Sequence, residues 1–182
     1  MSNLENLAHL LKQRNVIAQQ ITDIIGRPAQ IGHIGEHIAA EIFGIELAKS
    51  AIHKGSDGVF RSGSLAGKTV NIKWYGKLES ILDIREDAVP DYFLVLTGPK
   101  SQVMTSRGEA RLWCIEFVFL FEVAELLPSL RARGIQIRIA TSVTKETWKN
   151  SEIFPAQNNK ALVLTDEQRS KLKLFGTEAL GV

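Results

Sequence analysis

The sequence contains a single cysteine and no long apolar run, and each of these absences excludes a class of protein. Cys114 cannot form a disulfide within the chain, and its apolar neighbourhood predicts a buried, small hydrophobic residue. The longest apolar stretch, Leu112 to Phe121, is interrupted by Glu116 and falls far short of the ~20 residues that a membrane-spanning helix needs. Because Glu5 comes early and no continuous apolar segment follows, no secretory signal is visible, and the chain is expected to be cytoplasmic.

The net charge is also small. A formal value of +2 is too low to indicate a nucleic-acid-binding protein by itself. The content of 45% hydrophobic and 23% charged residues is ordinary for a folded soluble protein. The 182 residues are expected to form one domain, residues 1–182, which is long enough to bury a hydrophobic core.

The charges are unevenly distributed along the chain. Between residues 48 and 78, Asp57 is the only acid, and the basic residues are Lys49, Lys54, Arg61, Lys68, Lys73 and Lys77. A local basic field around one carboxylate suits a polyanionic substrate such as nucleic acid. Solvated lysines on the edges of a hairpin would give the same pattern, so both interpretations stay open.

The apolar spacing predicts a mixed α/β fold. Helices are predicted at residues 4–24 (within an N-terminal segment 1–27), 31–47, 122–133, 144–150 and 165–175, with a break at Pro128. Strands are predicted at residues 57–60, 68–75, 91–96, 112–121 and 135–139, while the segments 76–90 and 100–111 are polar. This order of elements implies a mixed β-sheet flanked by helices.

The most informative residues lie on the predicted hairpin. Residues two apart in a strand share a face, so Asn71, Lys73 and Tyr75 point to the same side. If the hairpin closes across the loop at residues 62–67, Asp57 lies roughly opposite Lys73. A carboxylate, an amide oxygen and an ammonium then converge, which is the outline of a hard-metal site for phosphodiester chemistry. An exposed polar strand face fits the same alternation equally well.

A further carboxylate occupies an unusual place on the second predicted helix. Glu36 heads a line of otherwise apolar residues, Ala40, Phe43 and Leu47, at helical spacing. A buried carboxylate needs a metal, a lysine or a helix-end amide as its partner, because an unpaired buried charge is costly. Alternatively, Glu36 lies exposed in the first turn, where the helix dipole favours an acid.

The same helix contains a competing motif. Residues 33–37 spell H-x-x-E-H, which places His33 and His37 on one face beside a glutamate, as in the inverzincin metalloproteases. Such a zinc site needs a third ligand, and the candidates Glu109 and Glu116 fall in a predicted loop and a predicted strand. Two surface histidines are the simpler interpretation of this short pattern.

Three short motifs stand together in the chain: Gly35-Glu36 on an early helix, Gly55-Ser56-Asp57-Gly58 and Val70-Asn71-Ile72-Lys73. Together they resemble the motifs of the PD-(D/E)XK nuclease superfamily, which has the restriction-endonuclease-like fold. The resemblance covers residues 31–96. The continuation through residues 74–77 and 90–99 also looks like an uncharacterised bacterial family within that superfamily.

The resemblance implies a role for each of four residues. Asp57 matches the metal-binding aspartate, and Lys73 matches the lysine that orients the attacking water and stabilises the developing phosphorane charge. Asn71 occupies the ligand position usually filled by glutamate, aspartate or glutamine, and Glu36 matches the helix glutamate that supports the metal. The implied cofactor is Mg²⁺ or Mn²⁺, since such ions prefer oxygen ligands and can acidify a bound water.

The chain departs from the superfamily pattern at two positions. Ser56 replaces the proline of the motif, a change that many members tolerate. Asn71 is a neutral ligand, so Mg²⁺ binding should be weaker, and the site is expected to be slow, to need Mn²⁺ or to be inactive.

The function implied by the resemblance is a metal-dependent endonuclease that acts on DNA, with a role in restriction or defence suggested by family association alone. Many members act as homodimers. The alternative is a catalytically silent module that binds nucleic acid or a partner protein. In either case, the expected contacts to nucleic acid are Lys49, Lys54, Arg61, Lys68 and Lys77.

Overall fold

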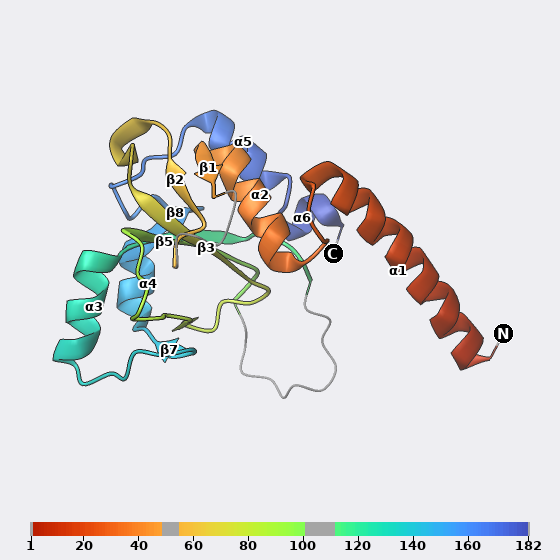
Figure 1. The fold of residues 1–182 in the computed structure, drawn as a ribbon, viewed down its shortest axis with the longest axis horizontal. Coiled ribbons are helices and arrows are strands. Elements are labelled where there is room, and N and C mark those ends of the chain that lie inside the picture. The colour runs from red at the N-terminus through yellow and green to blue at the C-terminus, as the bar shows by residue number, and fades with distance from the viewer. Residues whose placement is uncertain (1, 49–54, 101–111, 182) are drawn as a thin grey trace.

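A six-stranded mixed sheet forms the centre of the fold (Figure 1). The computed structural model describes residues 2–48, 55–100 and 112–181. The strands lie in the order β1 (Ile45–Leu47), β2 (Gly58–Phe60), β3 (Thr69–Tyr75), β5 (Tyr92–Thr97), β6 (Phe117–Glu122) and β8 (Glu152–Phe154). β3 and β5 are parallel, and every other neighbouring pair in this sheet is antiparallel.

Helices cover both faces of the sheet. They are α1 (Asn3–Ile25), α2 (Ile31–Phe43), α3 (Val123–Ala132), α4 (Lys145–Ser151), α5 (Asp166–Lys173) and α6 (Thr177–Leu180), with a 3₁₀ turn at Gly63–Leu65. Figure 1 shows α2 and α5 on one side of the sheet, α3 and α4 on the other, and α1 extending away from it. A small second sheet pairs β4 (Ile81–Leu82) with β7 (Thr141–Ser142). The predicted mixed sheet flanked by helices is therefore confirmed.

Two hydrophobic cores lie on opposite sides of the sheet, and the alternation along β3 separates them. Val70 and Ile72 are buried in the core beneath α2, together with Ile38. On the other side, Phe93 and Val95 of β5 pack with residues of α3 and α4. Since the parallel register places Asn71 beside Phe93 and Lys73 beside Val95, these two polar residues share the face of the second core.

The structure confirms the predicted extent of the first helix but not that of the second. α1 is confirmed almost to the residue; it begins with a capping box at Ser2 and ends at Gly26. The prediction that the second helix reaches Leu47 is wrong. Gly44 has φ +65° and ends α2 after Phe43, which frees Ile45–Leu47 to pair with β2.

Pro128 does not break the helix that contains it. α3 runs through Pro128, which lies on its exposed side together with Ala124. The missing N–H would have bonded the carbonyl of Ala124, and at an exposed position water can bond that carbonyl instead.

Two strand predictions need correction. Residues 135–139 form no strand, although Ile135 and Ile137 are partly buried against the second core. Ile139, the third apolar residue of the pattern, is exposed, so the alternation in sequence does not correspond to a strand face. The strand predicted from Leu112 begins only at Phe117, because the N–H of Ile115 donates to the carbonyl of Phe175 near the C-terminus.

The strands β2, β3 and β5 and the helices α4 and α5 agree with the prediction, including the capping box between Thr165 and Gln168. β4, β7, β8 and α6 were not predicted. Among the described residues, no helix combines the length and apolar character needed to cross a bilayer.

Candidate active site

The β2–β3 hairpin fixes the position of Asp57. The antiparallel register pairs Gly58 with Val70, so the residue across from Asp57 is Asn71. The expectation that Asp57 lies opposite Lys73 is wrong by two residues. The Asp57 N–H donates to the carbonyl of Val70 at 2.8 Å, and its carboxylate oxygen Oδ2 accepts the N–H of Ile72 at 2.6 Å.

The Asp57 carboxyl lies in a site that disfavours its charge. Burial raises its pKa above the ordinary aspartate value, and the nearby Glu36 carboxylate raises it further. The Ile72 N–H and the charges of Lys73 and Arg27 act in the opposite direction but do not outweigh burial. Asp57 therefore lies within electrostatic reach of both Glu36 and Lys73.

Glu36 reaches this site because α2 approaches β3 closely. A Cβ on Gly35 would lie 3.0 Å from the Cβ of Trp74, so only a glycine allows this contact without displacement. Glu36 lies in the second turn of α2 with a side chain only 17% exposed, so the alternative of an exposed first-turn acid is wrong. Its carboxylate forms an ion pair with Arg27.

Arg27 is a member of the site that the sequence reasoning missed. Arg27 follows α1 and lies nine residues before Glu36, a separation that matches no helix or strand repeat, so no local signal pointed to it.

The side chain of Asn71 lies across the hairpin from Asp57. Its side-chain oxygen Oδ1 is buried and has no hydrogen-bond partner among the described residues. A buried amide oxygen normally accepts at least one hydrogen bond, so an orphaned one has a free lone pair for a cation. Asn71 therefore fits the metal-ligand position that the resemblance assigns to it.

Lys73 is half-buried between two acids. Burial lowers the pKa of its ammonium, while Asp83 and, more weakly, Asp57 raise it. The ammonium nitrogen also lies 5.5 Å from the ring centroid of Phe93, at a distance where cation–π attraction operates.

Asp83 is the second residue that the sequence reasoning missed. Its N–H donates to the Tyr75 hydroxyl at 3.0 Å, and its Oδ1 accepts the N–H of Ala140 at 2.8 Å. Burial raises the pKa of Tyr75 strongly, so this hydroxyl stays protonated. Asp83 follows β4 in a polar stretch for which no structure was predicted, and therefore no local pattern pointed to it.

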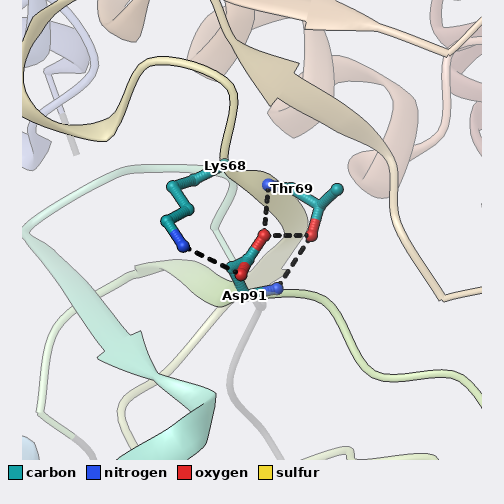
Figure 2. Close-up of polar contacts among 3 residues, drawn as sticks. All are labelled: Lys68, Thr69 and Asp91. Carbon is teal, nitrogen blue, oxygen red and sulfur yellow. Dashed lines mark hydrogen bonds and ion pairs between the residues drawn. The ribbon is translucent and has the colours of Figure 1, made fainter.

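Lys68, an expected nucleic-acid contact, is engaged in a structural network (Figure 2). Its ammonium lies 3.4 Å from Asp91 Oδ1. The other carboxylate oxygen of Asp91 accepts both the N–H and the hydroxyl of Thr69, each at 2.8 Å. These bonds lower the pKa of Asp91, led by the Thr69 N–H, so this network joins the starts of β3 and β5.

Of the remaining predicted basic contacts, Arg61 and Lys77 lie within the described residues. Arg61 forms an exposed ion pair with Glu46 at 3.5 Å, and Lys77 is half-buried. Lys49 and Lys54 lie outside the described residues.

The zinc interpretation of residues 33–37 finds no support in the contacts. The Nδ1 atom of His33 lies 2.9 Å from the carbonyl of Pro28, and Glu116 accepts two hydrogen bonds from Thr177. Within the described residues, no three or more His, Cys, Asp or Glu side chains are grouped for metal binding. A metal at the Asp57 site would therefore depend on Asn71 and on water in addition to carboxylates.

Cys114 is fully buried, as the sequence predicted. Burial raises the pKa of its thiol, with a contribution from Glu116, so the reactive thiolate is disfavoured.

No protein-family model matches the chain, and no curated protein is similar enough to count as a match. The resemblance to the nuclease superfamily thus rests on the motif residues alone.

Proposed function

We propose that this chain is a metal-dependent nuclease of the PD-(D/E)XK type, with the restriction-endonuclease-like core, and that it hydrolyses phosphodiester bonds in DNA. The observation that carries the proposal is the orphaned Asn71 Oδ1, directly across the hairpin from the half-buried carboxylate of Asp57. Two oxygen ligands that lack sufficient donors in the folded chain suit a hard divalent cation.

Three of the site residues would bind the metal ion. Asp57 and Asn71 would hold Mg²⁺ or Mn²⁺, with Glu36 supporting the ion from α2. When bound, such an ion polarises the scissile phosphate and acidifies a coordinated water. The Ile72 N–H fixes one carboxylate oxygen of Asp57 in place, which orients the group before any ligand arrives.

Lys73 would act on the substrate rather than on the ion. Its ammonium lies on the same strand and the same face as Asn71, and it is half-buried. In such a setting an ammonium stabilises the negative charge that develops on phosphorus oxygens more strongly than it would in bulk water.

The test is cleavage of plasmid DNA, single-stranded DNA and RNA with Mg²⁺ and, separately, Mn²⁺. We expect cleavage of DNA that falls at least about 100-fold in both Asp57→Ala and Lys73→Ala, because each removes a charge that acts in the transition state. Equal cleavage by the wild type and both variants would indicate a contaminating nuclease. Absence of cleavage by folded wild-type protein on all three substrates would contradict the proposal.

A catalytically silent binding module is the second candidate, and the ion pair between Glu36 and Arg27 favours it. Glu36 is paired with Arg27, and Asn71 carries no charge, so Asp57 provides the only unpaired carboxylate of the three expected ligands. This candidate predicts salt-sensitive binding of nucleic acid that survives Asp57→Ala. Binding that is lost together with divalent-ion affinity in Asp57→Ala would reject it.

A further inference from the structure

A cavity lies apart from the candidate active site. Its volume is about 710 Å³, within the range of small-molecule sites, and it opens between the segment after β3, the start of β6 and the helix α4. None of Asp57, Asn71, Lys73 and Glu36 lines it.

Three lysines surround this cavity: Lys100 after β5, and Lys145 and Lys149 on α4. Lys145 and Lys149 are one helical turn apart, so both ammonium groups project from the same side of α4. In the part of the chain that the structure describes, none of the three forms an ion pair. Lys68, Arg61 and Arg131, by contrast, each have a carboxylate partner.

One wall of the cavity is aromatic, and Phe117 is its accessible ring, because Phe119 and Trp148 are buried. Phe117 and Phe119 of β6 stack with ring centroids 6.2 Å apart, and Trp148 packs edge-on against Phe119 at 4.7 Å. The Lys100 ammonium lies 5.4 Å from the centroid of Phe117. A cation is therefore held directly beside an apolar aromatic surface.

Two carboxylates also line the cavity, but they do not cancel its charge. Oε1 of Glu152 accepts the N–H of Ala156 at 3.0 Å, and Glu79 is exposed. Three lysines and two glutamates give the lining of the cavity a net positive charge. Among the described residues, none of the three lysines forms an ion pair with either glutamate. This lining suits an anion that also carries a flat apolar group.

We propose that this cavity binds a 5′-phosphorylated nucleotide. A phosphate monoester carries close to two negative charges, which suits Lys145 and Lys149, and a nucleobase suits the aromatic wall formed by Phe117. The nucleotide comes either as a free mononucleotide or as the 5′-terminal residue of a strand. The inference goes beyond the proposed nuclease function and does not depend on it.

The test is isothermal titration calorimetry on the full chain. The ligands are 2′-deoxyadenosine 5′-monophosphate, deoxyadenosine, inorganic phosphate, and a short oligonucleotide with either a 5′-phosphate or a 5′-hydroxyl. We expect the mononucleotide to bind at least about tenfold more tightly than phosphate or the nucleoside, because each lacks one half of the recognised ligand. Tighter binding of the 5′-phosphorylated oligonucleotide than of the mononucleotide would identify the strand end as the source.

Matched variants separate this cavity from general charge effects. Lys145→Ala with Lys149→Ala should weaken mononucleotide binding at least about tenfold, while Lys160→Ala with Lys173→Ala should leave it unchanged. All four lysines are exposed, so both double variants are expected to fold, which thermal unfolding would verify. Undetectable binding of the mononucleotide, or equal affinity in the two double variants, would overturn the proposal. Asp57→Ala should bind the mononucleotide normally, which keeps this test separate from the nuclease test.

Discussion

Asp57 and Asp91 make similar contacts to β3 and yet respond to the fold in opposite ways. Each accepts a backbone N–H of that strand, from Ile72 at 2.6 Å and from Thr69 at 2.8 Å. The pKa of Asp91 is lowered, primarily by the Thr69 N–H and then by the Thr69 hydroxyl. The pKa of Asp57 is raised, because burial outweighs its single backbone donor.

The difference shows which carboxylate serves the structure and which is suited to a ligand. Asp91 has two donors from Thr69 and an ion pair with Lys68, and its side chain is 40% exposed, so its charge is satisfied. Asp57 is more deeply buried, has a second acid nearby and lies across from an orphaned amide oxygen. A bound cation would remove this deficit at Asp57, and nothing comparable exists at Asp91.

The largest expected contrast between the two aspartates is in catalysis. Asp57→Asn should reduce metal-dependent DNA cleavage at least about 100-fold, whereas Asp91→Asn should stay within about threefold of the wild type per folded molecule. Cleavage rates with Mg²⁺ and Mn²⁺, corrected for the folded fraction, measure this contrast. A comparable loss in both variants would show that the two carboxylates do not differ in role.

Stability should show the reverse order. Asp91→Ala removes two hydrogen bonds from Thr69 and leaves its N–H without a partner, so the free energy of unfolding should fall by about 2 kcal/mol after allowance for exposure. Asp57→Asn keeps the acceptor for Ile72 and removes a half-buried charge, so stability should be unchanged or higher. Urea unfolding of both variants without divalent ions tests this. A larger loss for Asp57→Asn would contradict the comparison.

A negative charge in place of Asn71 should strengthen metal binding at the Asp57 site and so increase its difference from Asp91. Asn71→Asp is expected to bind Mn²⁺ about tenfold more tightly than the wild type, which adds ~1.4 kcal/mol to the metal-dependent gain in unfolding free energy. Asn15→Asp on the exposed helix α1 serves as the control for added charge. Identical Mn²⁺ dependence in all three proteins would argue against Asn71 as a ligand.

The smallest expected effect is in the pH dependence of stability. The lowered pKa of Asp91 stabilises the fold above pH 3.8, and this contribution is lost as pH falls through the folded pKa. The raised pKa of Asp57 favours folding below pH 3.8, and that contribution is lost as pH rises through its folded pKa. Asp91→Asn should therefore flatten the rise of stability with pH, and Asp57→Asn should steepen it. Unfolding free energies measured between about pH 3 and 7 give the slope for each variant. A steeper slope than the wild type for Asp91→Asn, or a flatter one for Asp57→Asn, would contradict the assignment.

Part of the candidate site could be predicted from local pattern. The alternation of β3 correctly separates buried Val70 and Ile72 from half-buried Asn71 and Lys73, because strand geometry has a period of two residues. The register of the hairpin could not be predicted in the same way. The 3₁₀ turn at Gly63–Leu65 and the pairing of Phe60 with Lys68 set it, and they moved the residue opposite Asp57 from Lys73 to Asn71.

Arg27 and Asp83 show why the other members of the site could not be predicted from local sequence pattern. Arg27 meets Glu36 only because the turn between α1 and α2 folds back, and Asp83 reaches Tyr75 only because β4 pairs with the distant β7. Neither approach leaves a periodic trace in the sequence.

The sequence by itself determined the kinds of element, the side of β3 on which each residue lies, and the chemical groups of the motifs. These depend on the repeats of helix and strand and on capping residues, which are local properties. Only the tertiary structure decided which charges are paired, which carboxylate loses more of its solvent and which amide oxygen lacks a partner. Solvent exclusion and charge pairing depend on segments that meet in space, and for this reason two aspartates on similar backbone contacts acquire opposite pKa shifts.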